Sequence, residues 1–419
     1  MERGDRCRAR EPGSSMTEWS PERPLTVIVP LPPSYRGGTE EYAYRVARRL
    51  SESIPVQVVT TTVRLGQDSD ALPTGRVPVH ILPARELFQR PVVPRSSLRR
   101  MRELVERSRL VHLHMPFPWV ERKVVQWANA LSIPVLLTYH MDADFAAASS
   151  VPGAGLITSA YRRLSAYPAL RGASAIVSNS AGYSRASPVL RQFLPKVRVI
   201  YKGVDVERLE LLGSGPTAPP RPPPDPTLFP RTGPETRRVV FVGRLVPYKG
   251  LPILIQAVSH LAQGNLDVKL FIAGRGPMLP SLRRQVDRLG MGSRVEFLGF
   301  VPDARLAALY RGADVVACPS LSLLESTATC LEEGAACGVP VLGSSLPGTE
   351  ETVPSDGVHG FLAPPHDVSA VSEGLARLLR QPRPVDRVPY RTWEDTAEEY
   401  RRLVEELVEA RAPRSSPRP

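Results

Sequence analysis

The chain has 419 residues, of which 42% are hydrophobic and 23% are charged, as in ordinary soluble domains. This length suits two domains of roughly 150 to 200 residues each, and no apolar run approaches the roughly 20 residues that span a bilayer. The composition therefore predicts a two-domain protein that does not cross a membrane, and we expect it in the cytoplasm.

The net charge of +12 is unevenly distributed along the chain. Residues 1–210 contain 30 Lys and Arg against 19 Asp and Glu, whereas residues 211–419 contain 24 against 23. Between Asp144 and Asp205 there is no acidic residue. A field of one sign favours an anionic partner, although a GC-rich genome that encodes Arg freely would also raise the basic content.

Residues 1–22 lack the continuous apolar core of a secretion signal and are predicted to be a disordered tail. The spacing of Cys7, Cys318, Cys330 and Cys337 matches neither a zinc site nor a disulfide framework. The seven histidines form no HExxH or Cys/His cluster. We therefore expect free thiols, no bound metal ion and no other cofactor.

In the first half, short β-rich runs alternate with longer helical patterns, as in parallel sheets covered by helices. The predicted strands are 25–29, 56–63, 110–115, 134–140, 175–179 and 197–201. Segments such as EEYAYRVARRL and SLRRMRELVERSRL have apolar residues at helical spacing between them. These elements predict a Rossmann-like domain over residues 23–210.

The second half repeats this alternation after a proline-rich segment, 211–236, which we interpret as a linker. Its predicted strands are 238–243, 268–274, 294–299, 314–319 and 340–344, and they define a second Rossmann-like domain over 237–385. A last helix within 386–412 is expected to cross back to the first domain, and 413–419 to be a disordered tail. The predicted fold class is α/β, with two Rossmann-like, doubly wound domains.

Ligands of open parallel sheets bind at the carboxyl ends of the strands, so the loops there are the first candidates for a site. After the first strand, Gly37 and Gly38 precede a helix, and glycines there let backbone N–H groups approach a phosphate. After the first strand of the second half, Gly243 is followed by Arg244 and Lys249, two cations suited to paired phosphates. Each loop could also be an ordinary turn.

Two similar patterns are excluded. GRLVPYKG lacks the order of a Walker A loop. AGRGPM has Leu279 at the position of the third glycine of a dinucleotide fingerprint, which argues against an NAD site.

The stretch ESTATCLEEGAACGVPVLG begins with Glu325 and contains Glu333 eight residues later. Ser322 and Glu325 fit a capping box, which would make this acid a structural helix cap. On one helix the two acids would be about 12 Å apart, too far for a retaining acid and nucleophile pair, which needs about 5 Å. That separation matches the length of a nucleoside diphosphate sugar.

Asp142 and Asp144 form a D-x-D motif, a pair of carboxylates that could hold a metal ion. A hard cation needs further oxygen ligands, and the sequence places none beside this motif. We therefore expect no metal role for it.

Taken together, nine motifs carry a resemblance to one family. They are GGTE, TYH at 138–140, VIYKGVD at 199–205, GRLVPYKG, AGRGP, LGFVPD, the E-x7-E from Glu325 to Glu333, ACGVPV and GVHGFLAPPHD. In this order and over most of the chain, they resemble a family 4 glycosyltransferase of the retaining, GT-B type. The resemblance implies two Rossmann-like domains facing a cleft, the first binding the acceptor and the second a nucleotide sugar.

The resemblance also implies roles for single residues. Arg244 and Lys249 would hold the diphosphate, Glu325 would bind hydroxyls of the donor sugar, and His140 would lie against the sugar and the leaving group; these are the predicted catalytic residues. Glu333 would bind the ribose hydroxyls. The predicted donor-binding residues are Gly37, Gly38, Gly243, Gly274, Phe300, Val301, Ser326, Thr327, Ala328, Thr329 and Glu333.

The chain departs from the family pattern at three places. Thr327-Ala328 replaces the usual Phe-Gly, Pro347-Gly348 replaces Gly-Gly, and Lys202 replaces an asparagine before Gly203. These differences leave the identity of the donor open. Neither the spacing nor the resemblance assigns a role to Glu332.

The predicted function is transfer of a sugar from a nucleoside diphosphate sugar to a glycan or lipid-linked acceptor, with retention of configuration. No second carboxylate suits a nucleophile, so we expect same-face attack assisted by the leaving phosphate. An anionic acceptor, and peripheral association with the inner face of a membrane through basic elements such as AYRRLSAYPALRG, would fit the charge of the first half. The alternative is a non-catalytic nucleotide-sugar-binding or scaffold protein of the same fold. Nucleic-acid binding is not expected, because the basic stretch has no reading motif.

Overall fold

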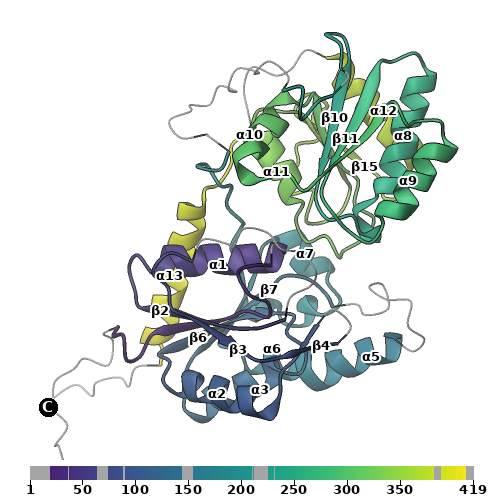
Figure 1. Cartoon of the computed structure of the whole chain (residues 1–419). Helices are drawn as coiled ribbons and strands as arrows, with labels where there is room; N and C mark the ends of the chain where they lie inside the picture. Colours follow the sequence, from purple (N-terminus) through teal and green to yellow (C-terminus); the bar gives the residue numbers. More distant parts are fainter. Residues whose placement is uncertain are drawn as a thin grey trace, which may run out of the picture. The chain divides into compact units, whose positions relative to one another are not determined.

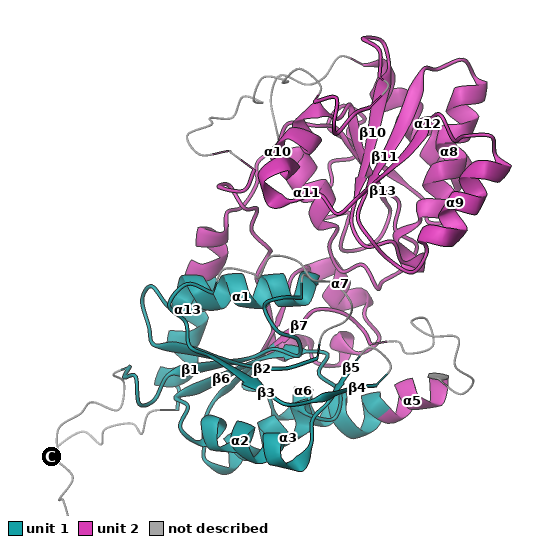
Figure 2. Cartoon of the chain, in the orientation of Figure 1, with its two compact units in different colours: residues 1–137, 161–175, 399–419 teal, residues 138–160, 176–398 magenta. Residues whose placement is uncertain are grey.

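The computed structural model describes residues 19–35, 37–63, 74–87, 90–143, 154–209, 211, 225–230, 232–381 and 388–411. Residues 1–18 of the predicted N-terminal tail, the predicted C-terminal tail, most of the predicted linker and Asp144 lie outside these residues. The chain divides into two compact units, one formed by residues 1–137, 161–175 and 399–419, the other by residues 138–160 and 176–398 (Figure 2).

The first sheet has seven strands in the order β3-β2-β1-β6-β7-β8-β9. These are β1 (Leu25–Ile28), β2 (Val56–Thr61), β3 (Val79–Leu82), β6 (Leu110–Met115), β7 (Val135–Tyr139), β8 (Ala175–Ser178) and β9 (Val197–Val199). Strand β1 pairs in parallel with both β2 and β6, so the strand order reverses there. All six strands predicted in the first half are present.

Helices cover this sheet on both faces, with α1 (Gly38–Leu50) on one side and α2 (Arg95–Glu106) and α3 (Glu121–Ala130) on the other (Figure 1). Three further segments follow β7 along the chain: α5 (Ala154–Tyr161), a π-helical turn (Arg162–Ala166) and α6 (Tyr167–Gly172). Helix α7 (Ala181–Ala186) follows β8. Strand β3 was not predicted from the sequence, and neither was a short antiparallel pair, β4 (Arg85–Leu87) with β5 (Arg90–Val92).

The second sheet has the order β12-β11-β10-β13-β14-β15. Its strands are β10 (Arg237–Val242), β11 (Val268–Ala273), β12 (Val295–Gly299), β13 (Val315–Cys318), β14 (Val341–Ser344) and β15 (Gly360–Ala363). Helices α8 (Leu251–Gln263), α9 (Leu279–Arg288) and α12 (Val368–Arg380) lie on one side, and α10 (Asp303–Gly312) and α11 (Thr329–Ala336) on the other (Figure 1). Strand β15 was not predicted.

Burial on both faces explains why the central strands are continuous apolar runs rather than alternating ones. Val240, Phe241, Leu270 and Phe271 are fully buried between the helix layers. Phe229, from the segment interpreted as linker, is buried as well and meets the Phe271 ring edge-on at 5.0 Å. The second sheet and its helices therefore form one core that extends into residues before β10.

Helix α13 (Trp393–Glu409) belongs to the second unit up to residue 398 and to the first unit from residue 399. Thr396 Oγ1 donates to the Tyr201 carbonyl at 3.0 Å within the second unit. In the first unit, the Tyr42 hydroxyl donates to that of Tyr400 at 3.1 Å, and the Tyr400 ring lies 5.1 Å from that of His112. This helix thus takes part in the packing of both units.

The two predicted Rossmann-like sheets are confirmed, and with them the α/β fold class. Among the described helices, none combines the length and the apolar character needed to cross a bilayer.

Candidate active site

Two glycines bring together the loops at the carboxyl ends of β10 and β11. The Gly243 N–H donates to the Ala273 carbonyl at 2.9 Å, and the Gly274 N–H donates to the Gly299 carbonyl at 2.6 Å. Gly274 has φ of 141°, and a Cβ atom there would overlap the carbonyl oxygen of Gly243. Glycine is required because the two backbones touch, which is how this sheet edge keeps its loops close.

Lys249 and Glu325 form an ion pair at the same edge of the sheet. Lys249 ends a single 3-10 turn (Pro247–Lys249), and the following Gly250 adopts φ of 70° at the start of α8. Glu325 is 6% exposed and also accepts a hydrogen bond from Ser320 Oγ at 3.1 Å. Burial alone would lower the pKa of Lys249, but the Glu325 carboxylate raises it well above its usual value. The ammonium is therefore a permanent cation at this site.

Glu325 and Glu333 do not lie on one helix. Helix α11 begins only at Thr329, and Glu325 lies in the preceding turn, where its N–H donates to the Ser322 carbonyl at 3.1 Å. Ser322 therefore caps no helix here, and the 12 Å helical spacing does not apply.

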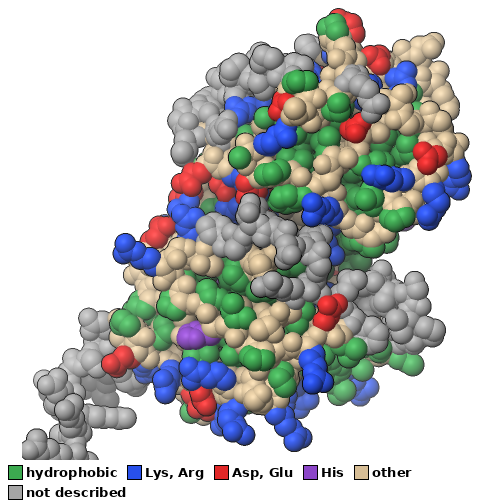
Figure 3. All heavy atoms as spheres, in the orientation of Figure 1, with side chains coloured by type: hydrophobic (Ala, Val, Ile, Leu, Met, Phe, Trp, Pro, Cys, Tyr) green, Lys and Arg blue, Asp and Glu red, His purple; other side chains and the backbone are tan. Residues whose placement is uncertain are grey.

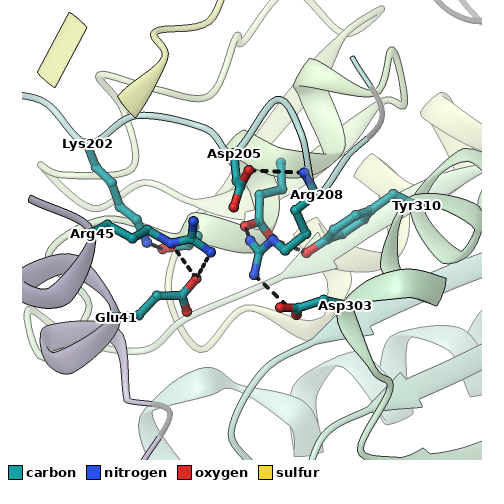
Figure 4. A network of polar contacts seen from close by, with 9 residues as sticks. Glu41, Arg45, Lys202, Asp205, Arg208, Asp303 and Tyr310 are labelled. Carbon is teal, nitrogen blue, oxygen red and sulfur yellow. Dashed lines mark hydrogen bonds and ion pairs between the residues drawn. The ribbon is translucent and has the colours of Figure 1, made fainter. Parts of the chain in front are cut away.

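Glu333 lies on α11 in a second polar cluster. Tyr310 donates its hydroxyl to Glu333 Oε2 at 2.7 Å, and Arg208 forms an ion pair with Oε1. Arg208 also lies 3.7 Å from Asp303 and donates its backbone N–H to Asp205 at 3.0 Å (Figure 4). Glu333 is 5% exposed, so this carboxylate is held in one orientation.

The first turn of α11 lies between these two carboxylates along the chain. Ala328 precedes it, fully buried, and no described side chain caps it. The ammonium of Lys202 donates a hydrogen bond to Thr329 Oγ1 at 2.8 Å. The partial positive charge at the N-terminus of α11 and the ammonium of Lys202 thus lie at the same place, and together they would favour binding of an anionic group.

Half-buried Ser326 and Thr327 complete the turn before α11. A Cβ on Gly348 would overlap the Ser326 carbonyl oxygen, so the glycine of the Pro347-Gly348 pair is needed for the loop after β14 to pack here. The turn that carries the predicted donor-binding residues Ser326 and Thr327 is therefore packed against the backbone of the loop after β14.

Arg244 and Phe300 are exposed members of the predicted site. Arg244 is exposed after β10, and Phe300, 38% exposed, lies under the guanidinium of Arg275 at 5.7 Å. Val301 is half-buried beside it. An exposed aromatic ring with a stacked cation offers a surface for a planar group.

His140 directly follows β7 and is 6% exposed. Burial, reinforced by the charge of Lys202, lowers its pKa to about 3, so the imidazole is neutral at physiological pH. Next to it, Asp142 accepts hydrogen bonds from the hydroxyls of Tyr139 at 2.9 Å and Tyr183 at 3.1 Å. These hydrogen bonds give Asp142 a structural role. Asp144, the other acid of the D-x-D motif, lies outside the described residues.

Gly37 and Gly38 lie in the first unit at the start of α1. Gly37 is the N-cap residue, and a Cβ there would overlap the Glu40 carboxylate and the Tyr35 ring. Gly38 is exposed. The requirement for glycine at position 37 thus has a local packing reason.

Within the second unit, the structure places Lys249 against Glu325 and Gly243 against Gly274, and brings Thr329 to Lys202. Arg208, Tyr310 and Ser320 were not predicted from the sequence. Arg208 follows the VIYKGVD motif closely, and that position was the available signal; Tyr310 is spaced like any core residue of a helix. Among the described residues, no three Cys, His, Asp or Glu side chains are grouped as metal ligands.

Two family models match the chain. The model "Glycosyltransferase Family 4" matches residues 36–208, and "Glycosyl transferases group 1" matches residues 229–395. D-rhamnosyltransferase WbpZ of Pseudomonas aeruginosa is 29% identical over 68% of this chain and 68% of its own length. A D-inositol 3-phosphate glycosyltransferase of Corynebacterium glutamicum is 36% identical, and a GDP-mannose-dependent alpha-(1-6)-phosphatidylinositol monomannoside mannosyltransferase of Mycolicibacterium smegmatis 37% identical. These alignments span only 40% and 39% of the relatives' own lengths and 40% and 35% of this chain.

Solved structures show the same fold at low identity. Anabaena HepE in complex with UDP and glucose superposes with a TM-score of 0.62 at 18% identity, over 93% of this chain and 97% of that one. Sucrose-phosphate synthase from Thermosynechococcus elongatus gives 0.63 at 20% identity, over 93% and 95%. Residues 36–208 are thus similar to a Glycosyltransferase Family 4 domain and residues 229–395 to a glycosyl transferases group 1 domain, and the fold is of the GT-B type.

Proposed function

We propose that the protein is a retaining glycosyltransferase that transfers a sugar from a nucleoside diphosphate sugar to a glycan or lipid-linked acceptor. The observation that carries this proposal is the largely buried Lys249–Glu325 ion pair, whose carboxylate lies four residues before the start of α11, a helix end with no side-chain cap. Such an arrangement offers a fixed cation and a helix end to a diphosphate and a carboxylate to a neighbouring sugar. Glu333, one helical turn further on, offers a second carboxylate to a ribose.

The chemical step follows from these groups. Breaking the anomeric bond leaves negative charge on the diphosphate, which Arg244, Lys249 and the α11 terminus would stabilise. His140 is neutral, because burial lowers its pKa, and it can donate or accept a hydrogen bond at the leaving group without adding charge. Attack of the acceptor hydroxyl on the face that the diphosphate leaves, with its proton passing to the departing phosphate oxygen, would retain the configuration.

Donor identity is tested first by binding. The relatives' names mention GDP-mannose, and one structural neighbour holds UDP-glucose, so a thermal shift panel begins with these and adds ADP-glucose. We expect one donor to raise the melting temperature, because a ligand bound to the folded state stabilises it by mass action. The panel also includes the corresponding nucleoside diphosphates. If none of these ligands raises the melting temperature, the proposal is contradicted.

Catalysis and stereochemistry need a separate measurement. With the stabilising donor, we expect slow hydrolysis or transfer that is lost in Glu325→Gln, and an NMR spectrum of the early product in which the anomeric configuration of the donor persists. Inverted product would overturn retention. Activity lost to a chelator and restored by manganese or magnesium would overturn the expectation that no metal is required.

The alternative function, a non-catalytic nucleotide-sugar-binding or scaffold protein, makes a different prediction. Donor would bind, but neither transfer nor hydrolysis would occur, and Glu325→Gln would behave like the wild type. The ion pair at Glu325 favours the enzyme, because a scaffold gains little from a desolvated charge pair at a ligand site.

An anionic acceptor at a membrane surface is supported by the charge of the first unit. Figure 3 shows Lys and Arg side chains along the lower part of the view, and the exposed basic residues of the first unit include Arg95, Arg99, Arg122, Lys123 and Arg163. We expect Lys123→Glu with Arg163→Glu to weaken binding to vesicles containing anionic lipid, and Arg284→Glu on α9 to leave it unchanged. If all variants bind the vesicles equally, the proposed association with an anionic membrane is contradicted.

A further inference from the structure

Lys202 occupies the position at which the VIYKGVD motif departs from the expected asparagine. Its ammonium donates to Thr329 Oγ1 at 2.8 Å, and Thr329 is the first residue of α11. Its charge also lowers the pKa of His140 and opposes the rise in the pKa of Glu332 that burial causes. The lysine therefore lies close to the first turn of α11 and to His140 at once.

The segment before α13 and the start of that helix hold this lysine in place. The Val204 N–H donates to the Arg391 carbonyl at 2.8 Å, and Thr396 Oγ1 donates to the Tyr201 carbonyl at 3.0 Å. The backbone is thus fixed on both sides of the lysine, whose Nζ lies 5.8 Å from the centre of the Trp393 ring. A cation that is positioned before a ligand arrives needs little reorganisation to bind it.

The proposed diphosphate site is short of positive charge without Lys202. Glu325 already balances Lys249, and Arg208 balances Glu333. Among the described cations assigned to this site, that leaves Arg244, which is exposed. A leaving nucleoside diphosphate carries about three negative charges near neutral pH, against about two while it is esterified to the sugar.

We infer that Lys202 is a further catalytic residue, whose ammonium binds the distal phosphate of the nucleoside diphosphate at the first turn of α11. This inference rests on the proposed function. Glu333, on the ribose side, lies four residues after Thr329, about 6 Å along the helix axis. The helix start is therefore the phosphate end of the site, and a cation there meets the charge that grows as the sugar leaves.

The experiment measures nucleotide affinity by calorimetry with UDP and GDP, and with UMP and GMP for comparison. We expect Lys202→Met to lower the affinity for the nucleoside diphosphate at least about tenfold, which is the loss typical of a charge-assisted hydrogen bond. The corresponding monophosphate should change less than about twofold, since it lacks the distal phosphate. Lys202→Arg should recover most of the affinity, and Lys269→Met on β11 should behave like the wild type.

Turnover gives a second readout that a merely structural role would not move. Because the lysine meets charge that develops in the transition state, Lys202→Met should lower kcat by a larger factor than it raises KM for the donor. An unchanged diphosphate affinity, or equal weakening of mono- and diphosphate, would overturn the inference alone. A wild-type protein that binds none of the four nucleotides would overturn the proposed function, and the role of Lys202 with it.

Discussion

The hydroxyl of Tyr310 donates a 2.7 Å hydrogen bond to Glu333 Oε2, and both residues are buried. Desolvation raises the pKa of Tyr310 well above its usual value, so the phenol remains a donor. Tyr310 therefore fixes the carboxylate that we assign to the ribose, together with Arg208 on the other oxygen.

Tyr310→Phe removes this hydrogen bond without changing the ring. We expect the free energy of unfolding to fall by about 1–3 kcal/mol, because a buried carboxylate oxygen loses a donor, and nucleoside monophosphate affinity to fall as well. Tyr44→Phe is the matched control, since Tyr44 is buried and donates to the Leu31 carbonyl at 3.1 Å in the first unit. Denaturant titration and calorimetry distinguish the two: equal nucleotide affinity in both variants would contradict the role given to Tyr310.

The Lys249–Glu325 pair predicts a non-additive double mutant. Lys249→Met and Glu325→Gln each leave a largely buried partner unpaired and should lower the free energy of unfolding by about 3–5 kcal/mol. The double variant should lose less than the sum, because no unpaired charge remains. Transferase activity should stay absent in all three. Additive losses in stability would show that the two side chains do not interact.

His140 should not titrate in the physiological range. Its folded pKa of about 3 lies below the usual value of 6.5, so the neutral form is favoured by folding. The stability gained in this way is fully present above pH 6.5 and is lost as the pH falls from 6.5 toward 3. Histidine NMR spectra, with the resonance assigned by His140→Gln, should show a constant shift between about pH 5 and 8. A midpoint near 6.5 would exclude the buried, neutral imidazole.

Glu121, at the start of α3, predicts the opposite pH dependence. Burial raises its pKa to about 8 from 4.5, despite nearby Tyr161 and Ser165, so folding favours the protonated acid. Its contribution to stability is fully present below pH 4.5 and is lost as the pH rises toward 8, by up to about 1.4 kcal/mol per pH unit. Glu121→Gln should therefore flatten the dependence of the melting temperature on pH between about 5 and 8. Glu103→Gln, at a half-exposed position on α2, should leave the profile as in the wild type.

Gly348→Ala tests the backbone contact between Gly348 and the turn at Ser326 that precedes α11. Its new methyl group would overlap the Ser326 carbonyl, so the loop must shift, and we expect about 1–3 kcal/mol of destabilisation together with weaker donor binding. Gly292→Ala is the control, because no atom lies within 4 Å of the place that its methyl group would take. Equal melting temperatures and donor affinities for the two variants would show that the Gly348 contact does not support the turn.

Much of the fold could be predicted from local pattern. The strands of both sheets are apolar runs separated by amphipathic helices, and parallel sheets buried on two faces produce that alternation. The strands that were missed have different reasons. The β4–β5 pair is short and largely exposed, and β3 is a four-residue edge strand interrupted by His80, so neither produces a continuous apolar run.

The sequence by itself determined the two-sheet architecture and the candidate residues of the second half, because strand periodicity and motif spacing are local properties. Only the tertiary structure decided which of those residues meet. Glu325 lies before α11 and forms an ion pair with Lys249. Glu333 is bound by Arg208 and Tyr310, which are 125 and 23 residues away in sequence. Lys202 likewise reaches Thr329 across 127 residues. Spacing along the chain cannot encode such contacts, since they arise when separate strands and helices pack and bring their ends to one edge of a sheet.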